Sequence, residues 1–416
     1  MKAVGIIAEY NPFHNGHQWH LQEARRLSNT NFSIAIMSGN FMQRGEPAIF
    51  DKWTRAQMAV TAGVDLVIEL PVAFAVRSAE YFATGGIRLL NALGVVSHVC
   101  FGAEHANISI LYTIAHALNN PAVVASLHQH LEAGYNYAAA WGQALEKVLG
   151  ISREVVASPN NILAVEYLRA LDSYAPALTP LPISRHMSGY HDTDINGTIA
   201  SATAIRKALP VDIDQAGSAL PAVSKNIITA KFAAGYAPIT FNNYDQMVLA
   251  VLRQASLQRL ALLPDVSEGL EHKLKTAALR VGNIEELLIN LKTKRYSRTR
   301  LQRLLIHVLL STTKTKLQSY DQTGPLYARV LAFNEQGREI LHHLKTTSAI
   351  PVITKTTHYL TSKKRDLHQL TSLESMLALD TTATDLYVLG HANQNFRRGG
   401  QDFQNPALFL STVTAH

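Results

Sequence analysis

The stretch "EYNPFHNGHQWHL", residues 9–21, follows the first apolar run of the chain and decides how the fold begins. The run itself, residues 3–8, is short, continuous and rich in β-branched side chains, which is typical of a strand buried on both faces. Beyond the turn the apolar residues keep helical spacing, and a proline and a glycine interrupt the chain in between. We therefore predict a strand-to-helix turn that carries two histidines, His14 and His17, around Gly16.

Such a turn suits an anionic ligand. The first N–H groups of a helix have no partner within it, and the helix dipole places about half a positive charge at that end, so phosphate groups bind there well. His14 and His17 add side-chain donors, and Gly16 lets a ligand approach the backbone closely. The motif alone leaves an alternative open, which is an ordinary turn with two solvated or core histidines.

A later segment has the same character. In "IASATAIRK", residues 199–207, Ser201 or Thr203 is placed to cap a helix whose first turns present Arg206. Taken by itself, this segment also fits a plain helix cap with a solvated arginine. Together with the histidine turn, it predicts two helix N-termini and three side chains that jointly hold a triphosphate and neutralise the departing pyrophosphate. The candidate catalytic residues are therefore His14, His17 and Arg206.

Composition limits the class of protein. A chain of 416 residues is long enough for two domains with their own cores, and 47% hydrophobic with 17% charged residues is typical of a globular protein. The single cysteine, Cys100, excludes a disulfide framework and a cysteine-based zinc site, and we expect it in the core and not as a nucleophile. No apolar run reaches membrane-spanning length and no signal peptide is apparent, so a cytoplasmic location is expected. No metal-ligating cluster is predicted.

The first half of the chain alternates strand and helix signals. Strand-like runs cover residues 3–8, 32–37, 65–70, 95–101 and, more weakly, 177–184, and helical patterns such as 51–62 and 78–93 lie between them. This alternation predicts an α/β fold with a doubly wound, Rossmann-like parallel sheet. Ligands of such sheets bind at the carboxyl ends of the strands, where the strand order reverses.

The domain prediction has two parts. Residues 1–210 are expected to form the catalytic domain, with a mostly helical insertion at about 107–156. Residues 211–416 are expected to form a mainly helical domain, with one late strand at 385–389.

Charge is unevenly placed between these halves. Residues 1–210 carry 14 Lys+Arg against 15 Asp+Glu, whereas residues 211–416 carry 24 against 16. Between Glu286 and Asp321 there is no acid at all, and the cations there are Lys292, Lys294, Arg295, Arg298, Arg300, Arg303, Lys314 and Lys316. A neutral half joined to a basic half predicts chemistry in the first domain and polyanion binding in the second.

Within the basic segment, Arg300, Arg303 and His307 recur at helical spacing opposite an apolar face. A solvated amphipathic helix is the alternative, but solvated faces normally mix both signs of charge. Phosphate contact is the favoured interpretation, with Tyr296 stacking on a base or a sugar. The candidate RNA-binding residues are Lys292, Lys294, Arg295, Tyr296, Arg298, Arg300 and Arg303, with a smaller patch at Arg397 and Arg398.

The histidine turn combined with a later Ser/Thr-x-x-Arg helix start resembles the nucleotidyltransferase superfamily. A closer resemblance, to the bacterial tRNA(Met) cytidine acetate ligase family, covers nearly the whole chain. It rests on "AEYNPFHNGH", "MSGNFMQRGEPAIFDKWTRAQMA", "GVDLVIELP", "SAEYFATGGIRLLNALGV", "SPNNILAVEY", "SATAIRKAL" and "TKRYSRTRLQRLLIHVLL", in this order.

The resemblance implies acetylation of the wobble cytidine of elongator tRNA(Met) to N4-acetylcytidine. ATP and acetate would give acetyl adenylate and pyrophosphate, and the cytidine amine would then attack the adenylate. ATP, acetate and the tRNA are the implied substrates. A requirement for Mg²⁺ and the oligomeric state stay open.

The resemblance also implies an ATP site, carried over position by position. Its residues are Ile7, Ala8, Glu9, Tyr10, Asn11, Pro12, Phe13, His14, Asn15, Gly16, His17, Gln18, Trp19, His20, Gly102, Asn160, Asn161 and Arg185, to which the second motif adds Ser201 and Thr203. A simple turn glycine is the alternative for Gly102, and a helix cap is the alternative for the Asn160–Asn161 pair. Ser184 stands where the family pattern has a second basic residue, which puts one contact in doubt.

Three groups remain. Residues 43–46 and the pair Asp51–Lys52 follow the second strand and are candidates for shaping the acetate or cytidine pocket, although Arg44 could simply pair with Glu46. Residues 189–192 either line the site or form a turn. Two other functions stay open: a small-molecule adenylyltransferase, which leaves the basic half unexplained, and an RNA-binding protein with a vestigial nucleotide fold, which the joint presence of both motifs disfavours.

Overall fold

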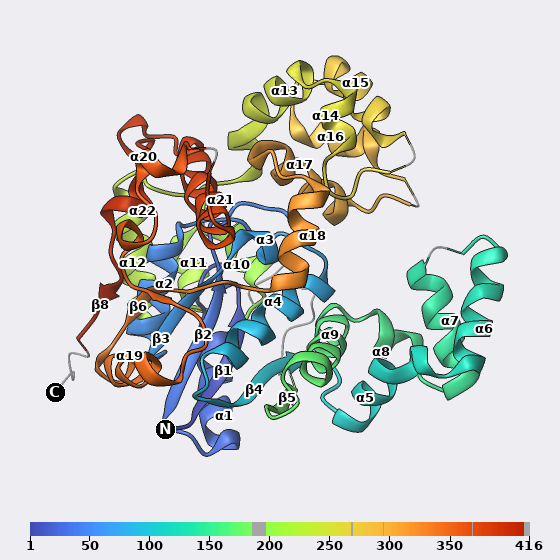
Figure 1. The fold of residues 1–416 in the computed structure, drawn as a ribbon, viewed down its shortest axis with the longest axis horizontal. Helices are drawn as coiled ribbons and strands as arrows, with labels where there is room; N and C mark the ends of the chain where they lie inside the picture. The colour runs from blue at the N-terminus through green and yellow to red at the C-terminus, as the bar shows by residue number, and fades with distance from the viewer. Residues whose placement is uncertain (136, 185–196, 268, 294, 368, 412–416) are drawn as a thin grey trace.

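The computed structural model describes residues 1–135, 137–184, 197–267, 269–293, 295–367 and 369–411. Its centre is one sheet with the strand order β5-β4-β1-β2-β3-β6-β7, and β8 pairs with β6 (Figure 1). The strands are β1 Ala3–Ala8, β2 Phe32–Ser38, β3 Leu66–Leu70, β4 Val96–Ala103, β5 Thr179–Ser184, β6 Ala328–Phe333, β7 Val352–Ile353 and β8 Leu408–Phe409. Strands β1 to β5 are parallel, which confirms the predicted doubly wound α/β fold.

Alternate side chains of the central strands enter two separate cores, as the two-residue period of a strand requires. In β2, Ile34 and Ile36 pack with helices α4 (Ala79–Ala92) and α9 (Pro159–Tyr174), while Ala35 and Met37 pack with α1 (Asn15–Ser28) and α2 (Lys52–Thr61). Helices therefore cover both faces, and the central strands are mostly apolar.

The order of the strands also locates the ligand-binding edge. From β1 the chain runs through β2 to β3 on one side, and then returns to β4 and β5 on the other. The strand order thus reverses between β1 and β4, which is where ligands bind in open α/β sheets.

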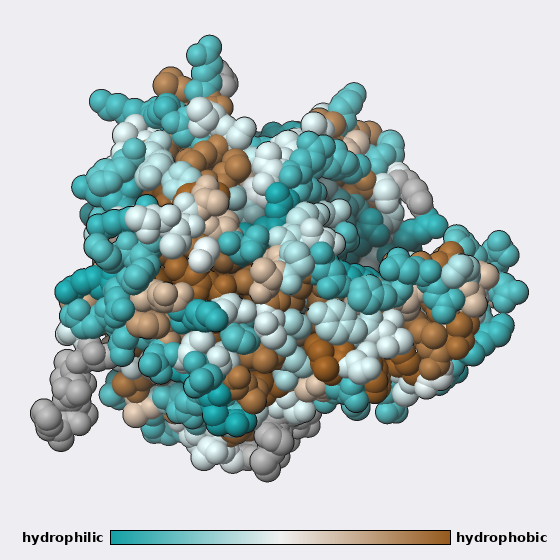
Figure 2. Space-filling model, turned by 60° about the horizontal axis from the view of Figure 1, so that its bottom comes forward, coloured by the Kyte–Doolittle hydropathy of each residue, from teal (hydrophilic) through white to brown (hydrophobic). Residues whose placement is uncertain are grey.

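Helices between β4 and β5 extend away from the sheet and form the right-hand end of the molecule in Figure 1. They are α5 Ile108–His116, α6 Pro121–Glu132, α7 Tyr137–Leu149 and α8 Arg153–Ala157. Figure 2 shows hydrophobic side chains gathered at this end. No single helix among the described residues is long and apolar enough to cross a membrane, although α5 and α6, bent by 74°, pass as a pair on length and composition.

The second half of the chain is mainly helical. The helices that matter below are α10 Ala202–Ala208, α13 Asp245–Gln254, α14 Leu257–Ala261, α15 Leu270–Arg280, α16 Ile284–Leu291, α17 Arg298–Leu310, α18 Lys314–Thr323, α19 Glu335–Thr347, α20 Ser362–Arg365, α21 Ser372–Tyr387 and α22 Gln401–Gln404. Helices α13 to α17 lie together above the sheet in Figure 1.

The predicted late strand at residues 385–389 is wrong. Those residues end α21 and continue into a short 3₁₀ turn, Val388–Gly390. The N-terminus of α21 is fixed by a capping box between Thr371 and Glu374. Most of the later residues of α21 are buried, and Tyr387 and Val388 at its end are fully buried, so the helix end gives a continuous apolar run like that of a buried strand.

A strand that the sequence analysis does not predict lies in the second half. The segment "ARVLAF", residues 328–333, pairs antiparallel with β3 and extends the sheet. Strands from both sides of residue 210 therefore share one sheet. The domain boundary at residue 210 stays a prediction, and the segments before and after it contribute strands to the same sheet.

A buried ionic cluster joins these two parts of the chain. Lys52 Nζ lies 2.9 Å from both carboxylate oxygens of Glu69 and 2.8 Å from Asp402. Arg329 of β6 lies against the same two carboxylates. Lys52 is thus wholly buried within the fold and Asp51 caps α2, so neither shapes a pocket as predicted.

Candidate active site

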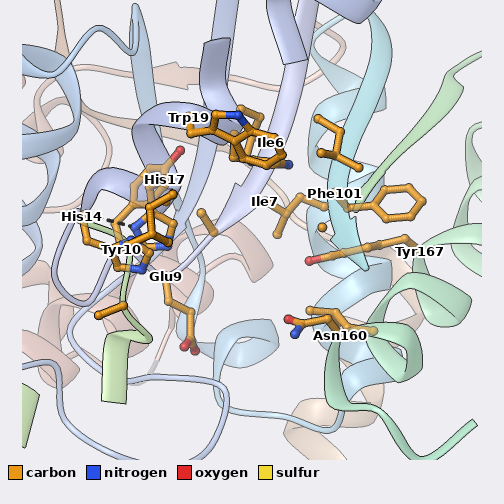
Figure 3. Close-up of a pocket in the computed structure, with 18 residues that line it drawn as sticks. Ile6, Ile7, Glu9, Tyr10, His14, His17, Trp19, Phe101, Asn160 and Tyr167 are labelled. Carbon is orange, nitrogen blue, oxygen red and sulfur yellow. Dashed lines mark hydrogen bonds between the residues drawn. The ribbon is translucent and has the colours of Figure 1, made fainter. Parts of the chain in front are cut away.

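A cavity opens at the carboxyl end of β1, where the strand order reverses (Figure 3). Its empty space, counted together with solvent at the open mouth, is about 910 Å³. Its described lining residues are Ile6, Ile7, Ala8, Glu9, Tyr10, His14, Gly16, His17, Trp19, His20, Phe101, Gly102, Asn160, Leu163, Tyr167, Ile183, Ile199 and Ala200. Eleven of these residues belong to the ATP site predicted from the sequence.

The two histidines lie at the start of α1, with His14 as the residue before its first turn. The backbone N–H of His14 donates to His17 Nδ1 at 3.3 Å. In a neutral ring whose Nδ1 accepts, the proton resides on Nε2, so the donor of the His17 ring is Nε2–H. The rings stack with centroids 3.6 Å apart, and a Cβ on Gly16 would lie 2.9 Å from His14 Cε1. The glycine therefore permits this stacked arrangement.

Aromatic side chains support the histidine turn from behind. Tyr10 and Phe13 are buried, and their ring centroids lie 4.9 Å and 5.6 Å from that of His17. Tyr10 has a φ of 47°, a left-handed conformation that is strained for a residue with a large side chain. Burial, followed by the nearby Cys100, raises the pKa of the Tyr10 hydroxyl. Strain of this kind concentrates at functional sites.

The second motif meets the first directly. Ser201 caps α10 by accepting from Ala204 N at 3.1 Å. Arg206 Nη1 donates to the carbonyl of Asn11 at 2.9 Å, and its Nη2 donates to Thr203 Oγ1 at 3.3 Å. The structure thus brings together the two segments that sequence reasoning paired across some 190 residues.

The cavity continues into a wider cleft. Its additional described lining includes Gln43, Arg44, Glu46, Ser201, Thr203, Arg206, Lys207, Thr299 and Arg303. The last two belong to α17, so the basic segment reaches the same space as the histidines. Among the candidate RNA-binding residues, Arg303 lies in this cleft and not on a separate surface.

A glycine explains how α17 comes so close. Gly45 has a φ of +79°, and a Cβ there would lie 2.1 Å from the backbone N of Arg303. Only a glycine at position 45 lets this loop pack directly on the backbone of α17. Gln302 Nε2 donates to Glu46 Oε1 at 3.1 Å and fastens the contact. Glu46 thus binds Gln302 of α17. From the sequence alone, a pair between Glu46 and Arg44 is the alternative to a role in the pocket.

The neighbouring asparagines divide their roles. Asn160 lines the cavity, and its Nδ2 donates to Glu104 Oε1 at 2.6 Å. Asn161 is 1% exposed and holds the backbone, since its Oδ1 accepts from His105 N and its Nδ2 donates to the carbonyl of Val155. Glu104 also accepts from the Asn161 backbone N–H at 2.9 Å, so it caps α9.

Other residues of the predicted ATP site support the turn without lining the cavity. Asn15 Nδ2 donates to the carbonyls of Thr198 and Ser218, and Phe13 is buried behind the turn beside Pro12. Gln18 Nε2 lies 3.5 Å from the carbonyl of Ala62. Three predictions lie outside the described residues: Arg185, Lys294 and the segment 189–192.

Cys100 occupies the core, as the sequence predicts. Its side chain is buried in β4, and burial raises the pKa of its thiol. Its Sγ lies 3.4 Å from His20 Nε2, a residue of the cavity wall. A thiol whose ionisation is suppressed is a poor nucleophile.

Sequence reasoning missed one wall of the cavity. Leu163 and Tyr167 follow Asn160 at spacings of three and seven residues, so the three lie on one face of α9. This helical period is visible in "NNILAVEY", but an apolar helix face indicates a core as readily as a ligand wall.

The basic segment is partly paired. Arg298 binds Glu285, and Arg300 donates to the carbonyl of Asp265 at 2.9 Å while covering the ring of Tyr296. Tyr296 is 8% exposed and its hydroxyl donates to the carbonyl of Ser267. Tyr296 is thus a core residue in this structure, and its ring is not exposed for the stacking that the sequence analysis predicts.

Five described cations of the predicted RNA surface are exposed: Lys292, Arg295, Arg298, Arg397 and Arg398, of which Arg298 is paired with Glu285. Arg397 also donates from Nε to the carbonyl of His391 at 2.7 Å. The exposed cations are the part of the prediction to which a phosphate backbone has access.

Comparison with known proteins agrees with this geometry. The sequence model of the HIGH Nucleotidyl Transferase family matches residues 1–402. A tRNA(Met) cytidine acetate ligase of Acetivibrio thermocellus is 40% identical over 99% of this chain and 100% of that protein. One of Syntrophomonas wolfei is 40% identical over 97% and 98%. The chain belongs to the tRNA(Met) cytidine acetate ligase family.

Solved structures extend the likeness to three dimensions. The crystal structure of Thermotoga maritima TmcAL without ligand superimposes with a TM-score of 0.91 at 34% identity, covering 99% of this chain and 100% of that one. The same protein bound to alpha-thio ATP gives a TM-score of 0.89 at 33% identity, with the same coverage. The expected Rossmann-like nucleotidyltransferase fold and the family resemblance are therefore confirmed.

Proposed function

We propose that this chain is an ATP-dependent ligase that acetylates N4 of the wobble cytidine in elongator tRNA(Met), with acetate as the acyl source and acetyl adenylate as the intermediate. One observation carries the proposal. The histidine turn and Arg206, which donates to the carbonyl of Asn11, both line the wider cleft into which the cavity opens, and Thr299 and Arg303 of the basic helix α17 line the same cleft. Family membership supplies the identity of the substrates.

The first step needs positioning and charge more than proton transfer. An oxygen of acetate attacks the α-phosphorus of ATP, the bond to the β-phosphate oxygen breaks, and pyrophosphate leaves with that electron pair. His17 Nε2–H, the N-terminus of α1 and the Arg206 guanidinium would face the charge that develops on the leaving group. Such preorganised donors are worth several kcal/mol, on the order of 10²–10³ in rate for each donor.

Mg²⁺ is part of the proposal only as a companion of the triphosphate. Within the residues that the structure describes, no three His, Cys, Asp or Glu side chains are grouped to hold a metal ion. The chain would thus hold ATP through histidine, arginine and backbone donors, and the phosphates themselves would bring the ion.

Capture of the tRNA would rest on exposed cations near this cleft. Lys292 and Arg295 precede α17, whose Arg303 lies inside the cleft. Phosphate contacts made there would lead the anticodon loop toward the cavity, in the cytoplasm, where tRNA is found. A small-molecule adenylyltransferase would have no use for this basic wall.

Two assays separate the proposed function from its alternatives. Acetate-dependent exchange between ATP and labelled pyrophosphate, measured with and without RNA, reports adenylate formation. Mass spectrometry of elongator tRNA(Met) after incubation with ATP and acetate reports an acetyl group on the wobble cytidine. Exchange without tRNA acetylation would favour a small-molecule adenylyltransferase, and RNA binding without exchange would favour a vestigial nucleotide fold.

A further inference from the structure

A carboxylate at the mouth of the cavity is not explained by the anionic substrates. Glu9 directly follows β1 and lines both the cavity and the wider cleft. In Figure 3 its carboxylate points into the open space between the histidine turn and Asn160. Both ATP and acetate are negatively charged, and a carboxylate here repels both.

The position of Glu9 is fixed from two sides. Its Oε1 accepts from the backbone N–H of Gln43 at 2.6 Å. Its own carbonyl accepts from Nη1 of Arg55, also at 2.6 Å, and Arg55 is wholly buried with its Nη2 3.0 Å from the carbonyl of Ser38. A backbone and a side chain held in this way are preorganised for a ligand, since little ordering remains to be done on binding.

One carboxylate oxygen of Glu9 has a protein donor and the other has room for a ligand. Among the described residues that line the cavity and cleft, the carboxylates are Glu9 and Glu46, and Glu46 binds Gln302. Within the described part of the chain no protein donor is bound to Glu9 Oε2. Glu9 Oε2 is therefore an acceptor that faces the cavity, and an uncharged group with an N–H donor would bind it favourably.

Two of the three substrates in the proposed function carry such a donor, the N6 amine of adenine in ATP and the N4 amine of cytosine. Of these two bases, only the cytosine must give up an amine proton in the reaction. Its exocyclic N4 amine has two hydrogens, and Glu or Asp is the side chain that accepts from it in base recognition. The opposite wall carries Tyr167, which is 3% exposed and whose hydroxyl has no partner among the described residues and points into the cavity in Figure 3. A hydroxyl donor there complements the N3 and O2 acceptors of the same base.

We propose that Glu9 binds the N4 amine of the target cytosine and accepts its proton as the acetyl group is transferred. This inference rests on the proposed function and assigns the step that follows adenylate formation. The N4 nitrogen forms a bond to the acetyl carbon, and the carbon–oxygen bond to AMP breaks. AMP leaves with that electron pair, and the N4 proton passes to Glu9 Oε2.

The test replaces Glu9 by Gln, which keeps the shape of the side chain but cannot accept a proton. Three quantities are measured on the full chain: acetate-dependent ATP–pyrophosphate exchange, tRNA affinity, and the single-turnover rate of acetyl transfer to tRNA. We expect transfer to fall by about 10²–10⁴, and to fall much further than either exchange or tRNA affinity. Glu9→Asp, which restores the carboxylate on a shorter side chain, should recover part of the transfer rate.

A matched control removes a carboxylate elsewhere. Glu335→Gln, at an exposed position on α19, should change none of the three quantities. If Glu9→Gln loses exchange as strongly as transfer, Glu9 serves ATP and the inference is wrong. If it loses tRNA affinity in proportion to transfer, Glu9 is a docking contact and the inference is again wrong. Failure of the unaltered chain to acetylate tRNA would instead overturn the proposed function.

Discussion

Replacing Asp402 by Asn tests the ionic cluster that ties the last part of the chain to the sheet. Asp402, Lys52, Glu69 and Arg329 are each no more than 3% exposed. Within these four residues two cations face two anions, and the buried Asp380, whose pKa burial raises to about 7, lies close enough to interact with Glu69 and Lys52. The Asn variant keeps the size of the side chain and leaves two cations against the single carboxylate of Glu69.

The magnitude follows from the ionisation of Asp402. Burial opposes its charged form, but Arg329 and Lys52 outweigh burial and lower its pKa from 3.8 to about 2. Such a shift corresponds to a folding free energy on the order of 2 kcal/mol at neutral pH. Removing one partner of a buried pair typically costs about 3–5 kcal/mol. We therefore expect Asp402→Asn to lower the free energy of unfolding by about 3 kcal/mol.

Urea unfolding at pH 7, followed by circular dichroism, measures this loss. Because the folded-state pKa of Asp402 lies below its unfolded value, the stabilisation is complete above about pH 4 and declines as the pH falls toward 2. The exposed pair of Glu335 and Arg338 gives a control, in which Glu335→Gln should cost less than about 0.5 kcal/mol. Lys52→Met added to Asp402→Asn restores the charge balance and should regain part of the loss. A single variant as stable as the unaltered chain would refute an ionised cluster.

Four further outcomes are expected. His17→Ala removes the Nε2–H donor and should lower ATP–pyrophosphate exchange by at least about 100-fold at unchanged tRNA affinity, so retained exchange would contradict its role. Arg206→Ala should lower turnover more than ATP affinity in steady-state kinetics, whereas a change in affinity alone would make it a ground-state anchor. Burial, then Arg77, lowers the pKa of His307 to about 3, so His307 is neutral in the folded chain and takes up a proton when the chain unfolds. The free energy of unfolding should therefore fall by about 2 kcal/mol between pH 7.5 and pH 5. His307→Gln should not show this fall, and melting temperatures measured across that range would test it. Lys292→Ala and Arg295→Ala should each flatten the salt dependence of tRNA binding by about one counterion, and an unchanged slope in binding titrations would place the RNA elsewhere.

Local sequence signals explain why the first strand and the first helix could be predicted. A continuous β-branched run, a turn with proline and glycine, and a helical period occur within the first 28 residues and need no distant partner. The strand at residues 328–333 is different, because it becomes a strand by pairing with β3, some 260 residues earlier. A six-residue apolar run has no period that separates a strand from a helix segment, so pairing decides the outcome.

The site shows the same division. The histidine turn and the Arg206 helix carry their chemistry in short motifs, and the bond from Arg206 to Asn11 joins them as expected. The contact of Gly45 with the backbone of α17 has no signal in either segment, since a glycine at a positive φ serves equally well in an isolated turn. The distribution of charge along the sequence therefore could not predict that Arg303 of α17 lines the same cleft as the histidines. It predicted chemistry and RNA capture in separate domains.

A shared wall has a consequence for the order of events. Acetyl adenylate is a mixed anhydride, and water would hydrolyse it if the cavity stayed open to solvent. The cleft that leads to the cavity is bounded by Arg303 and Thr299 of α17 on the side from which a polyanion would enter. An RNA loop seated on that helix would therefore cover the mouth of the cavity while it delivers the amine. The Gly45 loop binds α17, and the backbone of Gln43 in the same loop holds Glu9. The helix proposed to receive RNA is therefore connected by two short contacts to the residue proposed to bind the amine.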